Sequence, residues 1–158
     1  MGNLKIVHYP NKILRVKARP IAKLTNSNYD KIRRMFHIMY QLGGMGLAAP
    51  QIGWNARIFI MNLTGNDEDE LVFVNPIIMK EGGEPWEMEE GCLSFPGITG
   101  SVVRNSHVVV KAQSLNGRSF EFTDDKLAGR CVLHEIDHLS GILLIDRATK
   151  LFKGKDPL

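Results

Sequence analysis

The chain has 158 residues, 44% of them hydrophobic and 23% charged, with 20 Lys and Arg against 17 Asp and Glu. This length predicts one domain over residues 1–158 with a polar tail from about residue 153, and no apolar run approaches the roughly 20 residues that cross a bilayer, which excludes a membrane protein. The charges are spread along the chain without a dense basic cluster, so we expect neither a nucleic-acid partner nor a membrane partner.

The beginning of the chain lacks the apolar core and the cleavage site of a secretory signal, so we expect a cytoplasmic protein. Its two cysteines, Cys92 and Cys131, are too few for a disulfide scaffold. In a reducing compartment, a cysteine in a chain with histidine and glutamate motifs is more often a ligand or a nucleophile. We therefore expect cysteine chemistry rather than a disulfide bond.

The first predicted element is a helix over residues 26–41. Its apolar residues recur at helical spacing: Ile32, Met35, Phe36, Met39, Tyr40 and Leu42. Asn26, Ser27 and Asn28 are candidate N-caps, and the glycine pair at 43–44 is the predicted stop.

Between Arg57 and Phe122 the pattern changes to short β-rich runs, which are separated by Gly, Asn, Asp and Pro. The runs cover Ile58 to Asn62, Leu71 to Asn75, Ile77 to Met79, Gly100 to Arg104, Val108 to Ala112 and Ser119 to Phe122. No linker and no internal repeat divides them. The sequence therefore predicts a mostly antiparallel β region.

The second predicted helix begins at about Thr123, a candidate N-cap, and ends at Ser140 before Gly141. Apolar residues lie nearly all round it, which is typical of a buried helix. One face carries Leu127, Cys131, His134 and His138, and Val132, Leu133, Ile136 and Leu139 cover much of the rest. We therefore expect an α+β fold, with mainly antiparallel β-sheets around a buried central helix.

This second helix contains the sequence His-Glu-Ile-Asp-His at residues 134–138. Residues four apart on a helix point the same way, so His134 and His138 can reach one metal ion at about 2 Å, while Glu135 can face a bound water molecule. Two core histidines with a solvated glutamate would match the same pattern by chance. An unpaired glutamate on a buried helix would be costly, however, so the pattern favours a hydrolytic metal centre.

A catalytic centre of this kind keeps three protein ligands, so one more ligand is needed. Three isolated histidines are typical of surface or core positions: His8, His37 and His107. Cys92 follows Gly91 in a turn-rich stretch where the backbone can approach closely. Cys131 fits core packing equally well. We favour Cys92 as the third ligand and keep Cys131 as the alternative.

Three motifs in this order resemble those of the peptide deformylase family, across most of the chain. They are Gly-Met-Gly-Leu-Ala-Ala-Pro-Gln at 44–51, Glu-Gly-Cys-Leu-Ser at 90–94 and the His-Glu-Ile-Asp-His segment. The resemblance implies hydrolysis of the N-terminal formyl group of N-formylmethionyl peptides on newly made proteins, with release of formate. It implies nascent peptides as partners, and at most a transient contact with the ribosome.

The resemblance also assigns roles to residues. It implies one divalent metal ion, ferrous iron before zinc, with three ligands: Cys92, His134 and His138. It implies Glu135 as the catalytic acid and base, and Gln51 with the backbone N–H of Leu93 as the pair that stabilises the oxyanion. It suggests further that Glu90 and Arg104 form a buried pair that orients the cysteine loop.

Specificity for methionine would need an apolar pocket, for which Met45, Leu127 and Cys131 are suitable in type. Core packing would explain these three residues equally well. The backbone of the substrate could pair in the manner of a strand with the segment that contains Gly44 and Gly46, or with the neighbourhood of Gly91. We expect these six residues to bind substrate.

Other interpretations of the sequence remain. The family commonly has Gln before the first metal histidine, where this chain has Leu133. A metallopeptidase with an HExxH motif is one alternative function, although its third ligand is usually a downstream Glu or His. A non-catalytic, metal-stabilised binding protein of the same fold is the other. The segment Gly44 to Ala49 also matches a loose dinucleotide pattern, but it leaves a helix and meets Pro50 where a new helix should extend.

Overall fold

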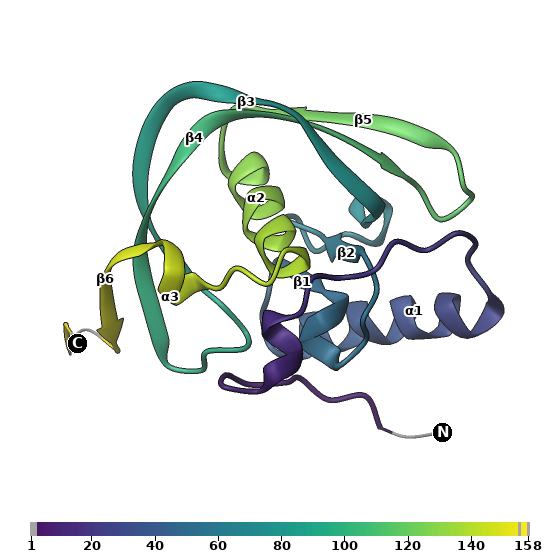
Figure 1. Ribbon diagram of the computed structural model, residues 1–158, viewed down its shortest axis with the longest axis horizontal. Coiled ribbons are helices and arrows are strands. Elements are labelled where there is room, and N and C mark those ends of the chain that lie inside the picture. The colour runs from purple at the N-terminus through teal and green to yellow at the C-terminus, as the bar shows by residue number, and fades with distance from the viewer. Residues whose placement is uncertain (1–2, 155, 158) are drawn as a thin grey trace.

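The computed structural model describes residues 3–154 and 156–157, and it has an α+β architecture (Figure 1). The helices are α1 (Asn26–Gln41), α2 (Leu127–Leu139) and α3 (Leu144–Arg147), with the short 3-10 helices η1 (Lys12–Arg15), η2 (Ala49–Ile52) and η3 (Asp67–Asp69). The strands are β1 (Gly46–Ala48), β2 (Ile58–Met61), β3 (Leu71–Gly91), β4 (Ile98–Gln113), β5 (Ser119–Asp124), β6 (Ala148–Lys153) and β7 (Asp156–Pro157). In the described part of the chain, no helix is long and apolar enough to cross a membrane.

These strands form one antiparallel sheet in the order β1-β2-β3-β4-β6-β7, and β5 pairs with β4 beside this path. The long strands β3 and β4 curve over α2 in Figure 1. The helix that carries the two motif histidines is therefore buried under a bent antiparallel sheet. This arrangement confirms the predicted fold class.

Strand β3 joins two runs that the sequence predicts as separate strands, and β4 joins the next two. Asn75 adopts a positive φ of 51°, and the register with β4 shifts between Val74 and Ile77. The Asn-Pro pair there forms a bulge inside a strand rather than a turn between strands. Two further shifts, between Ile78 and Lys80 and between Gly82 and Pro85, are additional irregularities along the curved strand.

All four residues of strand β2 are buried. Because alternate residues of a strand point to opposite sides of the sheet, β2 is covered on both faces. Phe59 and Met61 pack in one core with α2, whereas Ile58 and Ile60 pack in a second core with α1. The two helices lie on opposite sides of this part of the sheet in Figure 1. Because Gly46 of β1 pairs with Met61, the burial of β2 also positions β1 beside α2.

Helix α1 has the bounds that the sequence predicts, but its N-cap is Thr25 rather than one of the three polar residues after it. Thr25 Oγ1 accepts a hydrogen bond from the Asn28 N–H at 3.3 Å, and Asn28 Oδ1 accepts one from the Thr25 N–H at 2.8 Å. Asn28 thus takes part in a capping box from the third helical position. Gly43, with a φ of 68°, follows the end of the helix as predicted.

Helix α2 begins at Leu127, later than predicted, and Thr123 is not its N-cap. Thr123 lies in β5, where it pairs with Val109 of β4. The carboxylate of Asp124 accepts hydrogen bonds from the backbone N–H groups of Lys126 and Gly129, both at 2.8 Å. The free backbone N–H groups at the start of the helix are therefore satisfied by an acidic residue of the preceding strand.

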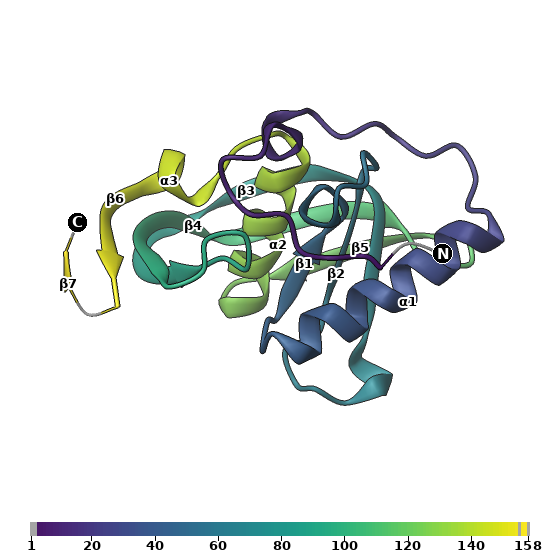
Figure 2. The same ribbon diagram turned by 90° about the horizontal axis from the view of Figure 1, so that it is seen from below.

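After α2 the chain forms α3 and then β6, which pairs with the beginning of β4. Strands β6 and β7 lie at the opposite end of the molecule from α1 (Figure 2). Gly100 of β4 lies under this junction, where a Cβ atom would come 2.8 Å from the Cβ of Ala148. The glycine therefore permits the close approach of β6.

Candidate metal centre

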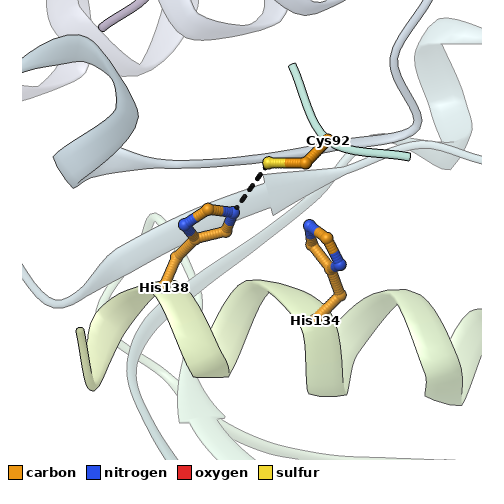
Figure 3. A group of neighbouring side chains, drawn as sticks. All are labelled: Cys92, His134 and His138. Atoms are coloured by element: carbon orange, nitrogen blue, oxygen red, sulfur yellow. Dashed lines mark hydrogen bonds between the residues drawn. The ribbon is translucent and has the colours of Figure 1, made fainter. Parts of the chain in front are cut away.

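Three side chains converge on one point in the structure: Cys92, His134 and His138 (Figure 3). Their ligand atoms all lie within 4.8 Å of one another, and Cys92 Sγ is 3.3 Å from His138 Nε2. The histidines come from adjacent turns of α2, and the cysteine follows the end of β3. One thiolate and two imidazoles form a donor set that suits a divalent transition metal. The fold therefore has a Cys-His-His metal site.

Cys131, the alternative third ligand, does not belong to the cluster found among the described residues. Burial, followed by the charge of Glu135, raises the pKa of the Cys131 thiol. The thiolate rather than the thiol binds a metal ion, so Cys131 is a poor ligand. Of the two cysteines, Cys92 is the one that lies with His134 and His138, and the three isolated histidines also lie outside the cluster.

The loop that carries Cys92 is held by backbone hydrogen bonds on two sides. The Cys92 carbonyl accepts from the Phe95 N–H at 2.9 Å, which closes a turn within the loop. The Ser94 carbonyl accepts from the Tyr9 N–H at 3.1 Å, which attaches the N-terminal segment. A loop with its own turn and an outside tether holds the sulfur in place before an ion binds.

Glu90 fixes the orientation of the His134 ring. Glu90 Oε2 accepts a hydrogen bond from His134 Nδ1 at 2.9 Å, which leaves Nε2 to face the metal site. Burial opposes the ionisation of Glu90, but hydrogen bonds from His134 and Arg104 outweigh it and hold its pKa below the ordinary value. Although burial acts the other way, hydrogen bonds with Cys92 and Glu90 raise the pKa of His134. A charged carboxylate therefore orients this ligand.

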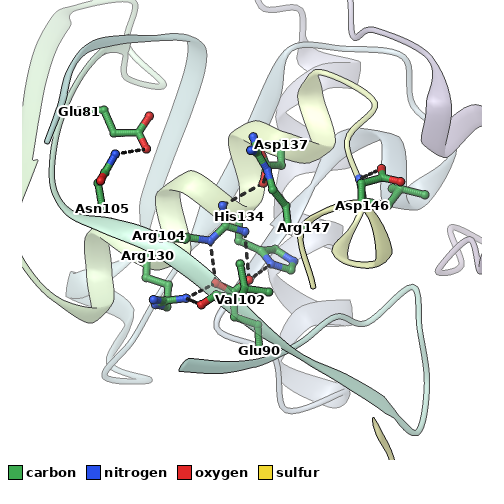
Figure 4. Close-up of polar contacts among 11 residues, drawn as sticks. Glu81, Glu90, Val102, Arg104, Asn105, Arg130, His134, Asp137, Asp146 and Arg147 are labelled. Atoms are coloured by element: carbon green, nitrogen blue, oxygen red, sulfur yellow. Dashed lines mark hydrogen bonds and ion pairs between the residues drawn. The ribbon is translucent and has the colours of Figure 1, made fainter. Parts of the chain in front are cut away.

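Glu90 and Arg104 form the buried pair that the resemblance suggests, and Arg130 joins them (Figure 4). Arg104 donates to both carboxylate oxygens, at 2.7 and 3.0 Å, and Arg130 donates to one of them at 2.7 Å. Two guanidinium groups compensate the desolvation of one buried carboxylate. Arg130 is not among the sequence-based candidates, although it lies four residues before His134 on the same face of α2, a spacing that could have identified it.

Glu135 is buried, with 4% of its surface exposed, and lies beside the metal ligands. Among the described residues, its Oε2 atom has no hydrogen-bond partner. Burial raises the pKa of Glu135 to about 7. A cation at the ligands would lower this pKa again, because it favours the charged form. Burial and a bound cation thus act on this pKa in opposite directions, which suits a carboxylate that accepts a proton and later returns it.

Gly46→Ala is expected to reduce hydrolytic turnover by about 10- to 100-fold, because the new methyl group would displace Glu135. A Cβ atom at Gly46 would lie 2.6 Å from Glu135 Oε1 and 2.9 Å from Cys131 Sγ. Gly82→Ala on β3 is the matched control, since its Cβ would meet no described atom within 4 Å. Steady-state kinetics on both variants checks the prediction, and equal activities would contradict it.

Gln51 is almost fully buried, with 1% of its surface exposed, and its amide points at the cysteine loop. Gln51 Oε1 accepts from the Ala48 N–H at 2.9 Å, which fixes the direction of the amide. Gln51 Nε2 then lies 3.1 Å from Ser94 Oγ and 3.6 Å from Cys92 Sγ. The Gln51 amide is thus an oriented hydrogen-bond donor beside the metal site, and such a donor can stabilise negative charge that develops on a bound substrate.

A cavity of about 1070 Å³ opens at the metal site. All six residues expected to bind substrate line it: Gly44, Met45, Gly46, Gly91, Leu127 and Cys131. Gln51, Leu93 and Glu135 line it too. The N-terminal segment contributes Leu4 and Ile6, which no motif in the sequence indicates. Leu133 of α2, which stands in place of the usual Gln, packs into the core and does not line this cavity.

The arrangement of the ligands fits a bound metal ion. Burial, followed by the charge of His134, lowers the pKa of His138 well below its ordinary value, so its imidazole is neutral, which is the form that binds metals. The His134 ring is fixed by Glu90, and Cys92 is held by its loop. Three converging donors with a buried carboxylate beside them are typical of a hydrolytic rather than a structural metal site, which would use four ligands.

Comparison with known proteins gives one consistent result. The family model of polypeptide deformylase matches residues 3–153. A peptide deformylase of Chromobacterium violaceum is 38% identical over 151 residues, which cover 96% of this chain and 90% of that relative. The crystal structure of a peptide deformylase from Legionella pneumophila has a TM-score of 0.89 at 40% identity and covers 94% of this chain and 87% of that chain. The Met-Ala-Ser-bound structure of a class I type b peptide deformylase from Acinetobacter baumannii has a TM-score of 0.85 at 33% identity, over 91% of this chain and 97% of that chain.

Proposed function

This chain belongs to the peptide deformylase family, and on that premise we propose which of its residues carry the reaction. The enzyme removes the N-terminal formyl group from nascent peptides at a metal site of one cysteine and two histidines. The observation that carries the assignment of roles is the convergence of Cys92, His134 and His138 beside the buried carboxylate of Glu135.

Ferrous iron is the proposed ion, with zinc as the alternative. Both suit a site with one soft thiolate and two imidazoles. When bound, a divalent ion supplies Lewis acidity, which polarises the formyl carbonyl and makes a neighbouring water molecule more acidic. Cys92, His134 and His138 would hold it.

Glu135 is the proposed general base and general acid. Its carboxylate takes a proton from the attacking water molecule as the new C–O bond forms to the formyl carbon. It then delivers this proton to the amine nitrogen as the C–N bond breaks, which releases formate and a free N-terminus. Its burial beside the metal ligands, which raises its pKa, supports both steps.

Gln51 and the backbone N–H of Leu93 are the proposed donors to the formyl oxygen, where negative charge develops during the attack. Support for this role comes from the fixed direction of the Gln51 amide, whose oxygen is already engaged by Ala48. Donors that are oriented before the reaction need not reorganise when charge appears, and they are therefore effective.

Gln51→Ala is expected to lower the rate of deformylation by about 100- to 1000-fold, as loss of one oxyanion donor usually does. The metal content should change much less, because Gln51 is not one of the three converging ligands. Measurement of kcat together with the metal-to-protein ratio checks this. Full turnover in the variant would refute the assigned role.

The proposed substrate is an N-formylmethionyl peptide that lies in the cavity as an added strand. The apolar side chains of Met45, Leu127 and Cys131 would contact the methionine, and the backbone near Gly44, Gly46 and Gly91 would pair with the peptide. The Met-Ala-Ser peptide bound to the relative from Acinetobacter baumannii supports a substrate of this class. Recognition of the main chain would tolerate varied residues after methionine.

Formate release tests the function directly. The purified protein is loaded anaerobically with Fe²⁺ or Zn²⁺ and supplied with formyl-Met-Ala-Ser or acetyl-Met-Ala-Ser. We expect formate and intact Met-Ala-Ser from the first peptide, faster with iron, and little reaction with the second. Cleavage of internal amides would favour an HExxH metallopeptidase, and metal binding without any hydrolysis would favour the non-catalytic binding protein.

The setting of the enzyme is proposed on the same basis. A single catalytic domain over residues 1–158 in the cytoplasm would meet nascent chains as they emerge from the ribosome. A contact with the ribosome itself would be transient.

A further inference from the structure

A second acidic side chain, that of Asp137, holds the same arginine that pairs with Glu90. Arg104 Nη1 donates to Asp137 Oδ2 at 2.9 Å, while its Nε and Nη2 atoms donate to Glu90 (Figure 4). Asp137 belongs to α2 and lies one residue before the metal ligand His138. Arg104 thus connects a carboxylate on the helix with the carboxylate that orients His134.

Arg147 of α3 holds this second carboxylate from outside. Its Nη2 donates to Asp137 Oδ1 at 2.8 Å, and its Nε donates to Asp137 Oδ2 at 3.1 Å. The pair is bidentate, which fixes direction as well as distance. The Arg147 side chain is 46% exposed, whereas Asp137 is 11% exposed and Arg104 is 6% exposed. Arg147 is therefore accessible to solvent, whereas Asp137 and Arg104 are largely buried.

The geometry of Arg104 explains why Asp137 matters to the metal site. A guanidinium group is planar, so the position of one nitrogen fixes the directions of the other two. With Nη1 held by Asp137, the remaining edge of Arg104 faces both oxygens of Glu90. Glu90 Oε2 is the atom that accepts from His134 Nδ1. The direction of the His134 ring is thus fixed through two carboxylates and one arginine.

We propose that Arg147 is a positioning residue for the metal site, which acts on His134 through Asp137, Arg104 and Glu90. This inference rests on the proposed function, because it concerns the same ligands. Loss of a group that touches a metal ligand typically weakens metal binding by about 10- to 100-fold. Arg147 is more remote, so we expect Arg147→Met to raise the dissociation constant of Zn²⁺ by about three- to tenfold.

The chain offers a matched control on the same short helix. Asp146, beside Arg147, accepts hydrogen bonds from both terminal nitrogens of Arg15, and the Arg15 side chain is 44% exposed. Arg15 has the same chemistry and a similar exposure to Arg147. The other hydrogen bonds of this pair among the described residues go to the Gly141 carbonyl and the Leu143 N–H, and not to Glu90 or Asp137. Arg15→Met therefore removes a comparably exposed arginine from an ion pair at the surface, where such pairs contribute little to stability.

Zn²⁺ affinity, measured by competition with a chelator, and the absorption spectrum of the Co²⁺-loaded protein provide readouts independent of turnover. Arg147→Met should weaken Zn²⁺ binding and alter the spectrum, and Arg147→Lys should fall between it and the wild type, because an ammonium group cannot bind Asp137 bidentately. Arg15→Met should match the wild type in both measurements.

The proposal is overturned by wild-type affinity and spectrum in Arg147→Met, or by an equal loss of affinity in Arg15→Met. Asp137→Asn supplies a second route if Arg147→Met does not fold, and unchanged Zn²⁺ binding in that variant would also contradict the proposal. If wild-type protein binds Zn²⁺ but releases no formate, the proposed function fails while the positioning role of Arg147 can still be measured.

Discussion

Glu135→Gln is expected to lower formate release by about 10²- to 10⁴-fold, the usual contribution of a positioned acid-base group. The amide has nearly the same shape as the carboxylate, but it can neither accept the proton of the attacking water molecule nor deliver one to the leaving amine. The metal site should persist, because Glu135 is not one of the three converging ligands. Rates of formate release and metal content, measured on the same preparation, check the prediction.

The control for this prediction is Glu121→Gln, which removes an exposed carboxylate from β5 and should leave the rate within about twofold, as surface substitutions usually do. A Glu135→Gln enzyme with a wild-type rate would remove the residue from the mechanism. Loss of both metal and activity would instead give Glu135 a part in holding the ion.

Cys92→Ala is expected to abolish both metal retention and deformylation, because two histidines remain where a hydrolytic site needs three ligands. Removal of the ion should also reduce stability. A ligand at 100 times its dissociation constant stabilises the folded state by about 2.7 kcal/mol, and this contribution disappears with the site. Metal analysis, formate release and the melting temperature with and without added Zn²⁺ test these three consequences together.

Cys131→Ala is the matched variant, and it should retain the metal ion, because Cys131 lies outside the ligand cluster. A Cys92→Ala protein that keeps one equivalent of tightly bound metal would contradict the assigned ligand set. So would a Cys131→Ala protein that loses it.

The two histidine ligands could be predicted because their geometry is local. The helical period alone puts His134 and His138 on one face of α2, and buried surroundings make Glu135 costly unless it has a task. The third ligand was identified by the turn-rich setting of Cys92 and by the family motif. A sequence can indicate such a setting, but only the path of β3 and β4 brings the sulfur to the helix.

Features that depend on contacts between distant segments could not be predicted in the same way. The Asn-Pro pair at 75–76 has the composition of a turn, yet cross-strand pairing with β4 retains it inside β3 as a bulge. Asp124 is an acidic residue of the kind that favours the first turn of a helix. It lies in β5 instead, and from there it accepts a hydrogen bond from a backbone N–H of α2. Arg147 has no motif around it, and only the packing of α3 brings it to Asp137.

Strand β2 has a consequence for how this enzyme can change through evolution. Its four residues are divided between two cores, and none of them is exposed. A shift of the strand by one residue would exchange the partners of both helices at once, and no position accepts a charge without burying it. Adaptation to new peptides is therefore expected at residues that line the cavity, such as Leu4 and Ile6 of the N-terminal segment, while β2, which contributes no residue to the lining, tolerates little variation.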